Sequence, residues 1–169
     1  MQSSAAFSKC RRYRYALWRQ WAEGPRVLFV MLNPSTADET VNDPTIRRCI
    51  SFAKAWGYGS LVAGNLFALR TPSPAVLKKN ANPVGPRNDA WLRRLLAESN
   101  FVVAAWGNHG QYRNRSDQVR KWLPRFHVLG ITKQGEPRHP LYVAGVKTPW
   151  HQLNSSQKNT HDCDPSARR

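Results

Sequence analysis

Short apolar runs alternate with amphipathic segments along most of this chain, and the alternation limits the folds open to it. Apolar runs typical of buried strands occur at 26–33, 60–68, 101–108 and 126–131. Segments with helical spacing follow at 43–56, 88–100 and 116–123. Because strands alternating with helices require crossover connections, the pattern predicts an α/β fold. We expect a three-layer α/β/α arrangement around a central, mainly parallel sheet of about four strands.

Local signals set several boundaries. For the helix at 43–56, Asp43 is suited to the N-cap, Pro44 is suited to the first turn, and Gly57 is suited to the position after the last turn. Ser116 is predicted to cap the helix at 116–123. Alternation at 10–21 followed by a Gly-Pro turn predicts an N-terminal strand or hairpin that folds back toward the strand at 26–33. We predict a flexible N-terminus at 1–9, a single α/β domain at 10–150 and a disordered basic and polar tail at 151–169.

The charge of the chain suggests its partners. Lys and Arg number 26 against 10 Asp and Glu, a formal net charge of +16. Such a surplus favours a polyanion, either a nucleic acid or a nucleotide, over a basic surface that has no partner. The three cysteines form no CxxC pair, so we expect no metal, no cofactor and no disulfide scaffold. No run approaches the roughly 18 apolar residues of a membrane span, and we expect no membrane partner and a cytoplasmic location. The oligomeric state stays open.

Polar residues gather where the four predicted strands end. The candidates are Asn33, Pro34, Ser35, Thr36 and Asp38 after the first strand, Asn65 and Phe67 at the second, Trp106, Gly107, Asn108 and His109 after the third, and Lys133, Arg138, His139 and Tyr142 after the fourth. Carboxyl ends of parallel strands share one edge of a sheet, and ligands bind there. We therefore expect these side chains to converge on one site.

Several of these residues also have purely structural interpretations. Asn33 before a proline fits an ordinary turn, and His139 fits a surface turn. Trp106 fits core packing better than ligand stacking. Asn65 is harder to explain structurally, because an amide inside an apolar strand must find partners, either internal or from a ligand.

Longer segments resemble a known bacterial family. The segments "MLNPSTADETVNDPTIRRCISFAKAWGYGSLVAGNLFALR", "NPVGPRND", "AAWGNHG" and "PRHPLYV" resemble the family catalogued as domain of unknown function 1643, over roughly residues 11–150. That resemblance implies no activity.

A more distant resemblance implies a fold and a chemistry. In order and roughly in spacing, "MLNPS", "VAGN", "VVAAWG" and "HPLY" are similar to the motifs of the uracil-DNA glycosylase superfamily, and "MLNPS" is closest to its mismatch-specific branch. The resemblance implies a uracil-DNA-glycosylase-like parallel sheet between helices. It places Asn33 at the position of the water-activating residue and Asn65 at the position that reads the edge of a pyrimidine.

The roles that follow define a hypothesis of N-glycosidic hydrolysis on a modified or mispaired base, as in DNA repair. Asn33 would place water with help from Asp38, and His139 would stabilise the departing base. The other candidates are base- or nucleotide-binding residues, with Phe67 stacking on the base, and Arg70, Lys133, Arg138 and Lys54 are candidate phosphate contacts.

The chain also departs from the superfamily. Asn33 cannot act as a general base, Ser35 replaces an aromatic residue, and Leu141 and Tyr142 replace the serines that grip DNA phosphate. Two alternatives therefore stay open, namely a non-catalytic nucleotide or nucleic-acid binding module, and an enzyme acting on small nucleotide-like substrates.

Overall fold

The computed structural model shows a mixed α/β fold and describes residues 1–123, 125–145 and 148–153. The strands are β1 (Gln2–Phe7), β2 (Arg14–Gln20), β3 (Arg26–Met31), β4 (Ser60–Asn65), β5 (Val102–Ala104), β6 (Arg125–Val128) and β7 (Trp150–Leu153). The α-helices are α1 (Pro44–Ala55), α2 (Pro74–Lys79), α3 (Asn88–Ala97) and α4 (Arg115–Arg120), and two 3-10 helices are η1 (Asn108–Asn114) and η2 (Pro140–Tyr142).

The strands form one sheet in the order β1-β2-β4-β3-β5-β6-β7. Its middle, β4-β3-β5-β6, is parallel, as the strand–helix alternation predicts. Antiparallel strands extend it on both sides, with β1 and β2 beyond β4 and β7 beyond β6. The described sheet therefore has seven strands, where the sequence predicts about four.

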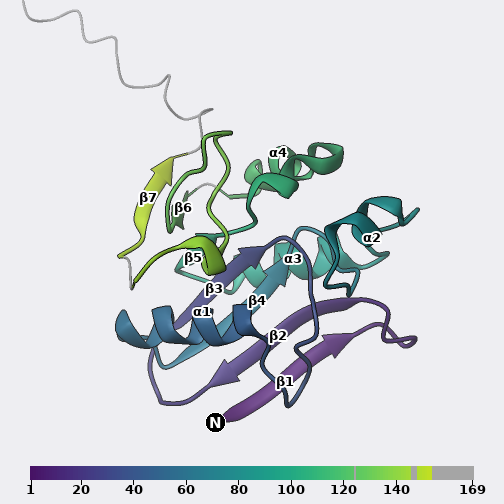
Figure 1. Ribbon diagram of the computed structural model, residues 1–169. Coiled ribbons are helices and arrows are strands. Elements are labelled where there is room, and N and C mark those ends of the chain that lie inside the picture. Colours follow the sequence, from purple (N-terminus) through teal and green to yellow (C-terminus); the bar gives the residue numbers. More distant parts are fainter. Residues whose placement is uncertain (124, 146–147, 154–169) are drawn as a thin grey trace, which may run out of the picture.

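Apolar side chains are buried on both faces of this sheet. On one face α1 contributes Ile46, Cys49 and Phe52, which pack against Phe29 and Leu61 of the strands. On the other face the apolar residues of α3, together with Leu77 of α2 and Val119 of α4, form a second cluster. Figure 1 shows α1 on the near face and α3 behind the sheet. Each large apolar side chain buried in this way contributes about 1.5–3 kcal/mol to the stability of the fold.

The boundaries of α1 follow the predicted signals. The Asp43 carboxylate accepts a hydrogen bond from the Ile46 amide at 2.8 Å, and Pro44 occupies the first turn. Gly57 follows the C-cap at a φ of 83°, a conformation that glycine adopts without strain.

The predicted cap at Ser116 is wrong. The N-cap of α4 is Asn114, in a left-handed conformation, because η1 leads directly into the helix. The Ser116 hydroxyl lies inside the fold and donates to the Glu136 carboxylate at 3.1 Å.

The two ends of the chain differ from the predicted organisation. Where the sequence predicts a flexible segment at 1–9, β1 pairs antiparallel with β2, from Gln2 opposite Gln20 onward. At the other end, residues 151–153 of the predicted tail belong to β7, and residues 154–169 lie outside the described part of the chain.

The chain folds back after β2, so that β2 and β3 run in opposite directions, but the two strands are not neighbours in the sheet. β2 pairs with β4, because β3 has β4 on one side and β5 on the other. The turn after β2 is fixed to β4 instead, since the amides of Trp21 and Ala22 both donate to the Gly59 carbonyl.

Candidate ligand-binding pocket

A pocket of about 770 Å³ lies at the carboxyl ends of the parallel strands. Segments that follow β3, β4, β5 and β6 all contribute to its lining, as does the first turn of α1. The sequence-predicted residues that line it are Asn33, Ser35, Trp106, Gly107, Asn108, His109, Lys133, Arg138, His139 and Tyr142. The structure thus brings together polar groups from loops that are far apart in the sequence.

Asn33 holds one wall of this pocket together. Its amide nitrogen donates to the carbonyls of Thr71 at 2.8 Å, Pro34 at 3.0 Å and Leu69 at 3.3 Å. The Thr71 amide donates back to the Pro34 carbonyl at 2.9 Å, so the loop after β3 is tied to the loop after β4. The Asn33 oxygen accepts no hydrogen bond within the described residues, and it is the atom that this side chain offers to a ligand.

The opposite wall depends on Gly107. Its φ of 71° is a conformation that other residues rarely adopt, and its amide donates to the Pro137 carbonyl at 2.8 Å. The Thr132 hydroxyl donates to the side-chain oxygen of Asn108 at 2.6 Å. These bonds fix the loop after β5 against the loop after β6, and they place Asn108 and His109 at the pocket.

Trp106 and Glu136 form a buried pair behind that wall. Trp106 is 1% exposed, and its indole N–H donates to Glu136 at 2.5 Å. Glu136 is 4% exposed and also accepts from Ser116 at 3.1 Å and from Arg120 at 2.8 Å. The Trp106 ring thus serves the core and lines the pocket, but its N–H has a protein partner. Sequence reasoning missed Glu136, because no local pattern marks it as buried.

His139 is neutral at pH 7. Burial lowers its pKa to about 4, and the Asp43 carboxylate opposes that shift only in part. Its Nδ1 accepts a hydrogen bond from the Leu141 amide at 3.4 Å, which leaves the proton on Nε2. The imidazole therefore offers a neutral N–H donor to the pocket.

The lowered pKa of His139 makes stability depend on pH. Between its ordinary value of 6.5 and about 4, the unfolded chain binds a proton that the folded chain does not. Above pH 6.5 the ionisation of His139 therefore does not lower the free energy of unfolding. Below that pH the free energy of unfolding decreases until the pH reaches about 4. In thermal melts, the Tm of His139→Gln should therefore decrease less between pH 7 and pH 4 than the Tm of the wild type. Parallel losses in both proteins would contradict a neutral His139 in the folded protein.

Two buried arginines of β2 were not predicted as site residues. Arg14 is 1% exposed and lines the pocket. Arg19 is fully buried and contacts the loop between β3 and α1 through Asn42 and the carbonyls of Asp38 and Val41. Burial lowers the pKa of Arg14 to about 10, so the guanidinium is charged at neutral pH. The sequence does not mark Arg14 and Arg19 as special, because arginines are common throughout this basic chain.

Other predicted site residues do not line the pocket. The Asp38 carboxylate accepts from the amides of Thr40 at 2.9 Å and Val41 at 2.8 Å, and these bonds lower its pKa. It therefore stabilises the turn in which it lies. Pro34 is buried and Thr36 is exposed, both outside the lining.

Asn65 and Phe67 are buried in the core. They are 1% and 0% exposed and do not line the pocket. Neither the nitrogen nor the oxygen of the Asn65 amide has a hydrogen-bond partner among the described residues. The partners that sequence reasoning requires for this buried amide are absent from the described part of the fold.

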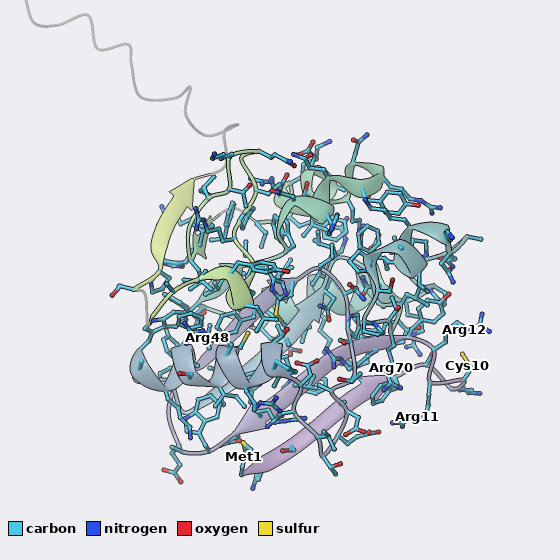
Figure 2. The ribbon with its side chains drawn as sticks, in the orientation of Figure 1. Met1, Cys10, Arg11, Arg12, Arg48 and Arg70 are labelled. Carbon is cyan, nitrogen blue, oxygen red and sulfur yellow. The ribbon has the colours of Figure 1, made fainter. Side chains whose placement is uncertain are left out.

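The predicted phosphate contacts divide into two groups. Lys133 and Arg138 are exposed and line the pocket. Arg70 does not line it, and donates to the Arg11 carbonyl at 3.2 Å. Figure 2 shows Arg70 near Arg11 at the β1–β2 end of the molecule. Lys54, in the last turn of α1, is likewise outside the lining.

Within the described residues, no group of three or more His, Cys, Asp or Glu side chains is arranged to hold a metal ion. In the same part of the chain, no helix combines the length and apolar character needed to cross a bilayer.

Fold and pocket together define an α/β protein with a largely apolar pocket at the carboxyl ends of its parallel strands, into whose lining several polar and basic side chains are set. A family model described as "Protein of unknown function (DUF1643)" matches residues 14–141. The chain belongs to this family. Searches of curated proteins and of solved structures found no match to the chain.

Proposed function

We propose that the pocket binds a nucleotide, either free or as a single unit of a nucleic-acid strand. The observation that carries this proposal is the pocket itself, which combines a charged, buried arginine with neutral hydrogen-bonding groups and apolar surface. Its volume of about 770 Å³ lies within the range of about 300–1,000 Å³ typical of small-ligand sites.

The charges around the pocket support an anionic ligand. Lys133 and Arg138 are exposed on its lining, where their charges attract an anion from solution. The formal net charge of +16 adds long-range attraction for any polyanion. Asn33, Asn108 and the Nε2–H of His139 supply the donors and acceptors that a base edge requires.

Binding of ligands of different length tests this proposal. We would titrate the protein with nucleoside monophosphates, nucleosides and oligonucleotides of 2–20 nucleotides, using isothermal titration calorimetry. A monophosphate is expected to bind in the micromolar to millimolar range, and affinity should rise little beyond a few nucleotides. Absence of monophosphate binding at millimolar concentration would contradict the proposal.

A charge-matched pair of variants shows where the ligand binds. Lys133→Gln with Arg138→Gln removes two positive charges from the pocket and should weaken monophosphate binding about tenfold, or about 1.4 kcal/mol. Lys54→Gln with Lys79→Gln removes two exposed charges outside the lining and should leave affinity within twofold. Equal losses in the two pairs would show that only the net charge matters.

N-glycosidic hydrolysis is the second candidate, and His139 is the residue that favours it. A neutral N–H donor suits a base that gains negative charge as its bond to the sugar breaks. The Asn33 oxygen is suited to orienting water. The proposal includes a three-layer, uracil-DNA-glycosylase-like arrangement, and differs from its sequence-based version because Asp38 and Asn65 lie outside the pocket lining.

Product formation tests the hydrolase hypothesis. Oligonucleotides with uracil, hypoxanthine, mispaired thymine or alkylated bases would be incubated with the protein and assayed for abasic sites. We expect abasic sites with at least one substrate and a loss of about 100-fold in rate for His139→Gln. If no substrate gives a product, or if His139→Gln and the wild type react at equal rates, the hydrolase hypothesis is contradicted. Nucleotide binding would then be the remaining proposal.

A further inference from the structure

We propose that Arg14 is the residue that binds the phosphate of the nucleotide, so that the phosphate lies inward and the base lies toward the exposed loops. This inference rests on the proposed function of the pocket. It reverses the orientation that the sequence suggests, in which the exposed Lys133 and Arg138 hold the phosphate.

The contrast between the two buried arginines of β2 carries the argument. Arg19 donates to Asn42 at 2.7 Å and to the carbonyls of Asp38 at 2.5 Å, Trp18 at 2.8 Å and Val41 at 3.2 Å. Arg14 makes a single hydrogen bond to the described residues, from Nη1 to the Ala37 carbonyl at 2.7 Å. Its Nε is buried and has no partner there. One arginine is satisfied by the protein, whereas the other lines the pocket and has donors without a partner among the described residues.

No carboxylate in the described chain forms an ion pair with Arg14. Asp43 is the acidic residue that raises its pKa most, but both Asp43 oxygens accept from amides, Ile46 at 2.8 Å and Ala37 at 3.3 Å. A buried charge without a close counterion is destabilising. A phosphate that entered the pocket would provide that counterion.

A second group of donors lies at the same pocket, at the start of α1. Thr45 is the second residue of this 12-residue helix and lines the pocket. Its amide and hydroxyl have no hydrogen-bond partner within the described residues, and an N-terminal helix amide is a favourable anion ligand. Ser35, after β3, adds a further hydroxyl to the lining. Several donors around one cation suit a phosphate, which has multiple acceptor oxygens.

The test uses inorganic phosphate as the probe and the whole protein. We would titrate phosphate into ¹⁵N-labelled wild type and follow the Nε resonance of Arg14, with acetate as a comparison anion at equal ionic strength. Saturable shifts of Arg14 with phosphate, and at least tenfold weaker shifts with acetate, are expected. This measurement needs no variant, so a folding defect cannot obscure it.

Variants then separate phosphate recognition from the rest of the pocket. Arg14→Gln should weaken binding of a nucleoside monophosphate at least tenfold and change binding of the unphosphorylated nucleoside less than twofold. Arg14→Lys, which keeps the charge but has no guanidinium fork, should give an intermediate loss. Lys54→Gln is the control for the loss of a positive charge outside the pocket.

The outcomes distinguish this inference from the proposed function. If the monophosphate binds and Arg14→Gln binds it equally well, the role of Arg14 is overturned while the nucleotide proposal stands. If phosphate shifts Arg14 but no nucleotide binds, the anion site stands and the nucleotide proposal is overturned. If neither phosphate nor nucleotide binds, both are overturned.

Discussion

Glu136→Ala is expected to lower the free energy of unfolding by about 3–5 kcal/mol, the cost of removing one partner of a buried ion pair. The substitution removes the carboxylate that Arg120 contacts at 2.8 Å. It also removes the acceptor of the Trp106 N–H and of the Ser116 hydroxyl, both of which are buried. Because Trp106 lines the pocket, the same change should also weaken ligand binding.

Chemical denaturation measures this effect, and an exposed ion pair provides the control. Glu98 pairs with Arg94 at 2.7 Å on the surface of α3, and both side chains are at least half exposed. Glu98→Ala should therefore change stability by less than about 1 kcal/mol. A loss below about 1 kcal/mol for Glu136→Ala would show that the buried network does not stabilise the fold.

Asn65→Leu is expected to raise the free energy of unfolding by about 1–3 kcal/mol, because a buried, unsatisfied amide imposes a cost of that size. Asn65 is 1% exposed, and both polar atoms of its side chain have no partner among the described residues. Leucine has a similar size and no polar atoms to desolvate. Urea denaturation of the two proteins in the absence of ligand measures the difference.

Asn88→Leu is the matched control for that prediction. Asn88 is equally buried, but its amide nitrogen donates to the carbonyls of Asn65 and Leu66, both at 3.0 Å. This variant should be destabilised by about 1–3 kcal/mol, since it loses both hydrogen bonds, although the Leu66 carbonyl still accepts from Arg115 at 2.8 Å. If Asn65→Leu is destabilised as much as Asn88→Leu, the Asn65 side chain has a polar partner, such as bound water.

Local patterns were sufficient to predict the middle of the sheet and α1. Residues 27–32 and 61–64 are buried, so their sequences lack polar side chains, and Asp43, Pro44 and Gly57 are local signals of helix ends. Because parallel strands share one edge, the predicted gathering of Asn33, Trp106 and His139 followed from strand direction alone.

The remaining features depend on contacts between distant segments. β1 begins with Gln2, Ser3 and Ser4 and has no alternating apolar stripe, and it forms because β2 offers it an unpaired edge. Whether a polar residue faces a pocket or a packed interior depends on its neighbours in space. For this reason the sequence does not reveal that Asn33 lines the pocket while Asn65 is buried in the core. The same holds for Arg14 and Arg19, which lie in one strand and differ only in the acceptors that other loops bring to them.

The most direct test of the central claim, that the pocket binds a nucleotide, is an NMR titration of ¹⁵N-labelled protein with a nucleoside monophosphate. We predict saturable shifts at the amides of Gly107, Asn108 and Thr45 and at the side chain of Arg14. Arg11 and Arg12, which lie with Arg70 near the turn between β1 and β2 (Figure 2) and outside the pocket lining, should not shift. Shifts confined to those exposed arginines would contradict the claim, since they would indicate attraction to surface charge without use of the pocket.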